Sequence, residues 1–205
     1  MQNSWSKCRR SGAVGIENFR AQGQNVGRNS RPSKRPWRPA QDKAREQVMI
    51  QKIKPFLWFD RQAEEAAKFY CSIFKNSKML EVARYPEGGP APAGSVMIAS
   101  FELEGMQFVA LNAGPLFKFT EAISFVVTTE SQEETDYYWN KLTADGGKES
   151  DCGWLKDKFG LSWQITPKAL IDLLSNPDKQ KTARVMAAMM TMQKIDIAAL
   201  QRAAQ

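Results

Sequence analysis

The pattern of apolar and polar positions divides the chain near Met49. Before this position apolar residues are scattered singly and follow neither period 2 nor period 3.6, whereas a dense pattern begins with Met49-Ile50-Gln51-Lys52-Ile53. Residues 1–48 are rich in Ser, Gly, Asn, Gln, Arg and Pro, and such a segment buries too little apolar surface to offset the entropy of ordering it. The sequence therefore predicts a disordered arm over residues 1–48, followed by a folded domain.

The first half of the folded part predicts a β-α-β-β-β unit. A short aromatic-rich strand over residues 53–59 precedes Asp60, which can cap a helix over residues 62–74. A segment rich in Pro and Gly and the tight turn Glu104-Gly105 then separate further strands. These strands are expected over residues 79–84, 95–103 and 106–112.

The second half repeats this order. A strand over residues 123–128, a helix over 132–142 capped by Ser131, two weaker strands and a last strand over 161–166 are expected. A shift of 69 positions superimposes Phe56-Leu57-Trp58 on Phe125-Val126-Val127, and the turn glycines Gly105 and Gly160 align the last strands. The sequence thus predicts an α+β fold with two βαβββ modules, over about residues 53–114 and 122–167.

Residues 168–205 predict a C-terminal helical tail that follows the duplicated domain of residues 49–167. Helices are expected over residues 167–174, from Asn176-Pro177-Asp178 to about Gln193, and over 196–204. The methionines between Met186 and Met192 form an apolar stripe that we interpret as packing.

Charge is concentrated in the arm. The whole chain has a net charge of +7, but residues 1–48 alone contribute +8 and the remaining 157 residues contribute −1. Three interpretations of the arm stay open: a segment that contacts nucleic acid, an Arg-rich transit peptide, or an upstream stretch before a true start at Met49. The folded domain has no electrostatic reason to bind polyanions.

Composition excludes several classes of protein. No apolar run approaches 18 residues, so no membrane span is expected, and no apolar stretch near the N-terminus indicates a secretory signal. The three cysteines lack paired spacing, which favours reduced thiols and a cytoplasmic location. The chain has no histidine, which excludes Ser-His-Asp and Cys-His triads and any metal site that needs imidazole.

Three runs of residues carry a family resemblance. The most specific is Cys152-Gly153-Trp154-Leu155-Lys156-Asp157-Lys158-Phe159-Gly160-Leu161-Ser162-Trp163-Gln164, supported by Pro55-Phe56-Leu57-Trp58-Phe59-Asp60 and Ala110-Leu111-Asn112-Ala113-Gly114-Pro115. With the two predicted modules, these runs resemble the vicinal oxygen chelate fold of the glyoxalase/bleomycin-resistance superfamily. The resemblance extends from Ile53 to Thr166 and points to the PhnB-like branch, often named the 3-demethylubiquinone-9 3-methyltransferase domain. It implies a homodimer with a ligand cavity between paired modules.

The resemblance also implies where metal ligands would lie, on the first and last strand of each module. The corresponding positions fall near Pro55, Val109, Ser124 and Gln164. Proline and valine cannot bind a metal, Ser124 is a poor donor, and the Gln164 amide is neutral and weak. We therefore expect a cavity without metal or other cofactor, in which Gln164 and Ser124 contact the ligand.

Four further residues are candidates for the cavity. By the internal alignment Leu57 and Phe59 form the pair that faces it, while Trp163 faces the core under the helices. Trp154 could stack on a ligand, and Cys152 could be a pocket thiol, although an inert buried thiol is the favoured interpretation. Asp157 is interpreted as a hairpin-turn residue.

The sequence thus favours a cytoplasmic protein that binds a small molecule in a metal-free cavity, with no assigned reaction. One alternative is an enzyme, either the methyltransferase of the family's name or a lyase or isomerase that uses Gln164, Ser124 and Cys152. Against S-adenosylmethionine binding, no G-x-G-x-x-G motif opens a helix after a strand. The other alternative is nucleic-acid contact through residues 1–48.

Overall fold

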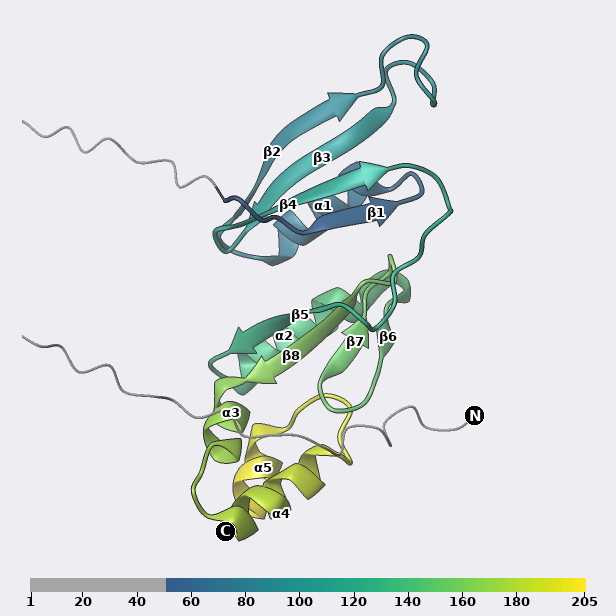
Figure 1. Ribbon diagram of the computed structural model, residues 1–205. Helices are drawn as coiled ribbons and strands as arrows, with labels where there is room; N and C mark the ends of the chain where they lie inside the picture. The colour runs from purple at the N-terminus through teal and green to yellow at the C-terminus, as the bar shows by residue number, and fades with distance from the viewer. Residues whose placement is uncertain (1–50) are drawn as a thin grey trace, which may run out of the picture. The chain divides into compact units, whose positions relative to one another are not determined.

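The computed structural model describes residues 51–205, so the predicted basic arm lies outside the described residues. The first module consists of β1 (Phe56–Phe59), α1 (Ala63–Ile73), β2 (Ser77–Arg84), β3 (Val96–Leu103) and β4 (Met106–Asn112). The second consists of β5 (Ser124–Thr129), α2 (Gln132–Thr143), the short turn η1 (Ala144–Gly146), β6 (Lys148–Glu149), β7 (Trp154–Lys156) and β8 (Ser162–Pro167). This order confirms the duplicated βαβββ unit (Figure 1).

Each module forms one four-stranded sheet with the same topology. The strand order is β1-β4-β3-β2 in the first sheet and β5-β8-β7-β6 in the second. The first strand of each module runs parallel to the last, and the other neighbours are antiparallel. The predicted hairpin turn between β3 and β4 is confirmed, because Glu104 and Gly105 have φ angles of 46° and 80°, as a two-residue turn with left-handed backbone requires.

A helix covers one face of each sheet, α1 the first and α2 the second (Figure 1). Because side chains alternate along a strand, the buried residues of β3 are every second one, Ala99, Phe101 and Leu103. The buried side of α1 carries small residues such as Ala66 and Ala67, which let the helix lie close to the sheet. We call the side of each sheet opposite its helix the open face.

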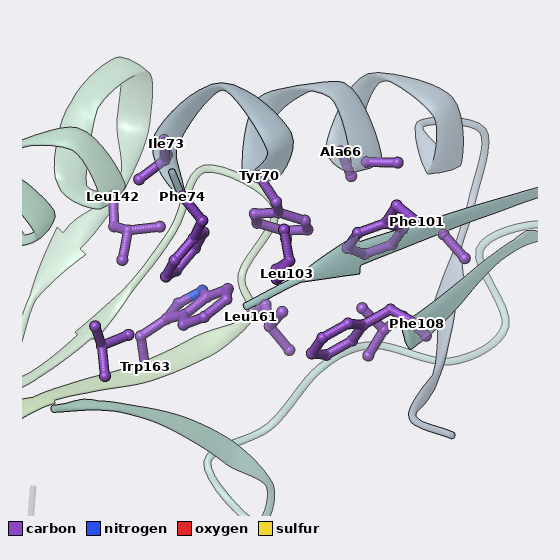
Figure 2. Close-up of a cluster of buried hydrophobic side chains, with 14 of the residues drawn as sticks. Ala66, Tyr70, Ile73, Phe74, Phe101, Leu103, Phe108, Leu142, Leu161 and Trp163 are labelled. Carbon is purple, nitrogen blue, oxygen red and sulfur yellow. The ribbon is translucent and has the colours of Figure 1, made fainter. Parts of the chain in front are cut away.

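An aromatic core joins the two modules (Figure 2). Phe74, just after α1, stacks on Trp163 of β8 with ring centroids 5.5 Å apart and on Tyr138 of α2 at 5.2 Å. Between the sheets, Phe108 of β4 meets Phe125 of β5 edge-on at 5.1 Å. Burying each such ring stabilises the fold by about 1.5–3 kcal/mol, so the modules depend on each other for their core.

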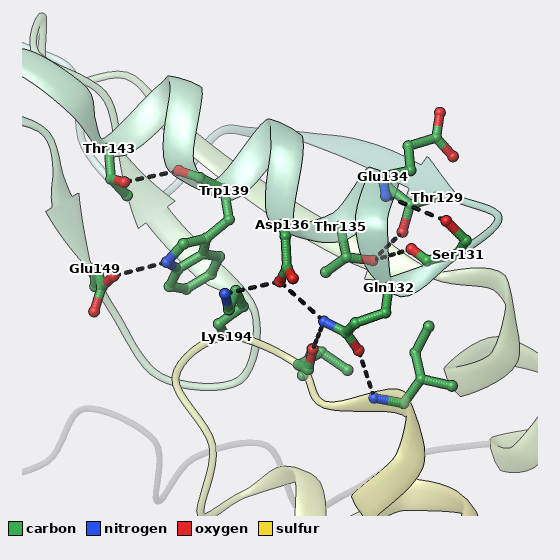
Figure 3. Close-up of polar contacts among 12 residues, drawn as sticks. Thr129, Ser131, Gln132, Glu134, Thr135, Asp136, Trp139, Thr143, Glu149 and Lys194 are labelled. Atoms are coloured by element: carbon green, nitrogen blue, oxygen red, sulfur yellow. Dashed lines mark hydrogen bonds and ion pairs between the residues drawn. The ribbon is translucent and has the colours of Figure 1, made fainter.

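The C-terminal helices α3 (Lys168–Leu174), α4 (Lys179–Met189) and α5 (Ile197–Ala203) enclose a small core of their own, formed by Leu170, Val185, Ile195, Leu200 and Ala204. This tail is fastened to α2 by Gln132, whose amide donates to the Ile195 carbonyl at 3.1 Å and accepts from the Ile197 N–H at 2.9 Å (Figure 3). An ion pair between Lys194 and Asp136 at 2.7 Å adds to the attachment. No helix within residues 51–205 is long and apolar enough to cross a membrane.

Two helix boundaries differ from the sequence prediction. Asp60 does not cap α1; the Oδ1 of Asn112, at the end of β4, accepts from the Ala63 N–H at 2.8 Å instead. Helix α4 begins after Asp178, whose carboxylate accepts from two backbone N–H groups, and it ends at Met189 rather than near Gln193. The following residues turn because the carbonyls of Met192 and Gln193 accept from the loop before β7.

Candidate functional site

The structure brings two predicted site residues, Gln164 and Ser124, into direct contact on the open face of the second sheet. On β8, Trp163 and Ile165 are buried on the helix side, so Gln164 between them faces the open side. Its Nε2 donates to the Oγ of Ser124 on β5 at 2.8 Å. Since Ser124 accepts through Oγ, its own hydroxyl hydrogen and the Oε1 of Gln164 remain to meet a ligand.

Apolar side chains flank Gln164, whereas Ser124 lies beside Ser162 in the register. The register places Val126 of β5 and Trp154 of β7 opposite Gln164 on either side, so Trp154 lies on the open face as its predicted role requires. In the first sheet, Phe56 of β1 and Val109 of β4 occupy the positions that correspond to Val126 and Gln164 in the second. Val126 is 56% exposed and Phe56 is 58% exposed, although both are large and apolar.

The other predicted pair, Leu57 and Phe59, does not face the open side. Both are buried in the core beneath α1, and Trp58 between them takes the other side of β1. The predicted shift of 69 positions between the modules is wrong by one residue in this strand. The buried residues Leu57 and Phe59 correspond to the buried residues Val127 and Thr129, which lie 70 positions later in the chain. In contrast, the matched positions Phe108 and Trp163 on the last strands are both buried, as the turn glycines predict.

Cys152 lies apart from the Gln164–Ser124 pair, in the loop before β7. Its φ is 61°, its N–H donates to the Met192 carbonyl at 2.7 Å, and its sulfur lies 3.6 Å from that of Met190. Burial, and then the charge of Asp151, raise the pKa of the thiol, so the protonated form dominates at neutral pH. A role as an activated nucleophile is therefore not supported by its surroundings.

The donor set on the open face does not fit a catalytic metal ion. Gln164 and Ser124 are neutral oxygen donors, and the register partners Phe56, Val109 and Val126 offer none. Nor does any cluster of three or more Cys, Asp or Glu side chains suited to a metal occur in the described part of the chain.

The connections from strand to helix do not fit the glycine-rich turn that holds S-adenosylmethionine in Rossmann-like folds. Asp60-Arg61-Gln62 joins β1 to α1, and Glu130-Ser131 joins β5 to α2, so neither connection contains glycine. Both sheets are also mainly antiparallel. A helix N-terminus that cradles phosphates after a parallel strand is therefore not formed at either place.

A cavity of about 380 Å³ lies between the end of β1, the linker after β4 and the turn from β7 to β8. Five aromatic side chains line it: Trp58, Phe59, Phe117, Phe119 and Phe159. Three lysines, Lys118, Lys156 and Lys158, also face it. Lys156 of β7 lines the cavity and pairs in register with Ser162 of β8. Because Ser162 pairs in turn with Ser124 of β5, the cavity adjoins the open face at Lys156. A second, larger hollow of about 780 Å³ lies beside the Pro/Gly loop at Pro90–Pro92.

The most strongly held polar residue, Asp157, was predicted only as part of a turn. The turn is confirmed, since the Gly160 N–H donates to the Asp157 carbonyl at 2.9 Å. However, the side chain is 2% exposed and accepts from Tyr70 Oη, Trp163 Nε1 and the N–H groups of Phe159 and Leu161, at 2.8, 2.8, 2.9 and 3.1 Å. Alternation from the buried Leu155 could have shown that Asp157 points inward.

Asp157 thus links α1 of the first module to the β7–β8 turn of the second. Burial raises the pKa of this carboxyl above its ordinary value and outweighs the four hydrogen bonds, which act to lower it. Burial, followed by the charge of Asp157, also raises the pKa of Tyr70. Tyr70 therefore stays a hydrogen-bond donor to Asp157.

Comparison with known proteins agrees with this architecture. The model of the family 3-demethylubiquinone-9 3-methyltransferase matches residues 51–166. A PhnB protein from Bacillus cereus, described as a 3-demethylubiquinone-9 3-methyltransferase, is 40% identical with a TM-score of 0.53, over 57% of this chain and 99% of its own. A Staphylococcus aureus protein is 32% identical over 57% of this chain and 95% of its own, with a TM-score of 0.27.

The fosfomycin resistance protein FosX from Listeria monocytogenes is also similar, at 14% identity and a TM-score of 0.40, over 56% of this chain and 90% of its own. Among curated proteins, none matches the chain.

Proposed function

The chain belongs to the 3-demethylubiquinone-9 3-methyltransferase (PhnB-like) family of the vicinal oxygen chelate superfamily, and we propose that it binds a small molecule without a metal on the open faces of its modules. The observation that carries this proposal is the hydrogen bond from Gln164 to Ser124, with Val126 and Trp154 on either side of Gln164. Ligand sites combine apolar contact with a few placed polar groups, and Val126, Gln164 and Trp154 bring both kinds of side chain together here.

The free groups of the pair define the ligand's chemistry. Gln164 Oε1 accepts and the Ser124 hydroxyl donates, so the ligand carries a hydrogen-bond donor beside an acceptor on an otherwise apolar body. Trp154 and Val126 flank the pair and supply apolar contact. This chemistry fits the small oxygenated metabolites expected from the sequence, and no reaction is assigned.

A second copy of the chain completes the proposed site. Phe56 and Val126 occupy matching register positions in the two modules, and each is more than half exposed. Covering both would remove exposed apolar area from water, and the internal duplication makes a twofold interface self-complementary. We place this homodimer in the cytosol, because Cys71 and Cys152 are unbridged.

Thermal denaturation with a panel of quinols and other small oxygenated metabolites tests the binding. A ligand that raises the melting temperature of the natural chain should lose this effect in Gln164→Leu, which removes the polar amide at similar volume. Gln180→Leu is the matched control, because Gln180 lies on α4, away from both sheets. An equal shift in Gln164→Leu would overturn the proposed site, and stoichiometric divalent metal in purified protein would overturn the metal-free cavity.

Light scattering after size-exclusion chromatography tests the homodimer. Phe56→Lys places a charge in the proposed interface and should yield monomers. Met106→Lys is the control, because Met106 is also exposed but lies on the helix side of β4, in step with the buried Phe108. A natural chain that is monomeric at all concentrations would contradict the homodimer.

A further inference from the structure

We propose that the 380 Å³ cavity beside the linker binds a planar aromatic molecule that carries a negative charge, such as an aromatic carboxylate. Neither Gln164 nor Ser124 lines this cavity, although it adjoins the open face at Lys156, and the inference does not rest on the function proposed above. Its volume lies at the lower end of the range for small-molecule pockets, which suits one ring or two fused rings.

The aromatic walls are fixed before any ligand binds. The Trp58 Nε1 donates to the Gly114 carbonyl at 2.8 Å, which sets the plane of the indole. Phe117 meets Trp58 edge-on, with centroids 4.9 Å apart and planes at 80°. Deeper in the cavity, Phe59 contacts Phe119 and Phe159 in the same manner, at 5.2 and 5.9 Å. These contacts hold the aromatic side chains in place, so a flat ligand ring can pack against them without the entropic cost of ordering them first.

The exposure of the Phe117 side chain is a second observation that favours an aromatic ligand in this cavity. It is 60% exposed in a linker without regular structure, yet it lies against Trp58 rather than in the core. Its neighbour Leu116 is 74% exposed and does not line the cavity. A ligand ring in the cavity would cover the exposed part of the Phe117 ring and remove apolar area from contact with water.

Charge selects an anion over a cation. Three lysines and one carboxylate, Asp60, line the cavity. Lys156 is paired with Glu121 at 2.5 Å, and Lys158 is paired with Glu65 at 2.9 Å while lying 5.0 Å from the centre of the Phe159 ring. Within residues 51–205, Lys118 forms no ion pair, so its charge is available to a ligand. Asp60 is paired with Arg61 at 3.8 Å, so Lys118 is the one lining charge without an ion-pair partner among the described residues, and it favours an anion. Lys158 already occupies a cation–π position.

Titration with 2-naphthoate, followed by tryptophan fluorescence and calorimetry, tests the proposal. The natural chain should bind 2-naphthoate more tightly than the uncharged 2-naphthalenemethanol. Lys118→Gln should weaken 2-naphthoate binding by about two- to fivefold and leave the alcohol unchanged, in keeping with a solvent-exposed ion pair. Lys141→Gln is the control, since Lys141 is exposed on α2 and likewise forms no ion pair among the described residues.

The aromatic wall is tested by Phe117→Ala against Leu116→Ala, two exposed neighbours of which only the first lines the cavity. Phe117→Ala should weaken both naphthalene probes, and Leu116→Ala neither. Equal binding by the natural chain and Phe117→Ala would overturn the site, and equal affinity for the acid and the alcohol would overturn the preference for an anion. Loss of 2-naphthoate binding in Gln164→Leu would also overturn this inference, while supporting the open-face site.

Discussion

At the scale of single residues, Asp157 has the most demanding surroundings in the described part of the chain. Its carboxylate is nearly inaccessible to water and holds Tyr70 from one module and Trp163 from the other. A buried charge is tolerated only when donors surround it, and here four donors do so. Asp157 therefore fixes how the β7–β8 turn meets α1.

Replacing Asp157 by Asn should lower the free energy of unfolding by about 1–3 kcal/mol. The amide NH₂ donates and cannot accept. If it replaces Oδ2, Trp163 Nε1 loses its acceptor, and if it replaces Oδ1, the N–H groups of Phe159 and Leu161 lose theirs. Urea denaturation measures the change. Asp172→Asn is the control, because Asp172 is exposed on α3, and it should stay within about 0.5 kcal/mol of the natural chain. Equal stability of the two variants would contradict this account.

The same substitution should change the pH dependence of stability. Because the pKa of Asp157 is raised in the folded chain, its contribution is fully present below the ordinary value of 3.8 and is lost as pH rises through the raised pKa. The stability advantage of the natural chain over Asp157→Asn should therefore shrink as pH rises across that window. Urea titrations at several pH values measure the difference, and an advantage that grows with pH would refute the assigned direction.

At the scale of elements, the two modules begin their helices by different means. Ser131 caps α2 locally, because its Oγ accepts from the Glu134 N–H at 3.2 Å, as the sequence predicted. Helix α1 instead receives its cap from Asn112 on β4, 49 positions along the chain. Asn112 also donates to the Val96 carbonyl at 3.1 Å, so it joins β3, β4 and α1.

This difference predicts that Asn112→Ala destabilises the fold and Asp60→Ala does not. Loss of a helix cap costs about 1 kcal/mol, and the bond to Val96 adds to it, so Asn112→Ala should cost about 1–2 kcal/mol. Asp60→Ala should stay within about 0.5 kcal/mol of the natural chain. Thermal or urea unfolding of both variants decides between them. A larger loss of stability in Asp60→Ala than in Asn112→Ala would instead identify Asp60 as the cap of α1.

At the level of the whole molecule, the described fold lies in the part of the chain that is nearly neutral. Residues 1–48 contribute +8, whereas the 157 residues from Met49 onward contribute −1. The module sheets, their shared aromatic core and the C-terminal helices all lie in the second segment.

A chain that begins at Met49 should therefore lose affinity for polyanions without losing stability. On a heparin column the full chain should be retained until salt screens its charge, and the shortened chain should elute without retention. Its melting temperature should match that of the full chain, because the core residues are all kept. Equal retention of both chains would show that the folded domain itself binds polyanions.

Local patterns in the sequence predict the order of the elements, the turn at Glu104-Gly105 and the cap at Ser131, and the structure confirms all three. These features depend on neighbours in the chain, so local pattern and turn chemistry are sufficient to predict them. It also placed Gln164 on the open face, because alternation with the apolar Trp163 and Ile165 gives β8 a clear inside and outside.

Tertiary packing determines which side of β1 faces the core, that Asn112 caps α1 and that Asp157 meets Tyr70. Each residue of Phe56–Phe59 is apolar, so alternation carries no information there, and a one-residue shift exchanges the two faces. The cavity could not be predicted from the sequence either, because Trp58, Phe117 and Phe159 come from three separate segments of the chain. The physical reason is common to all: these contacts join residues far apart in the chain, and only packing brings them together.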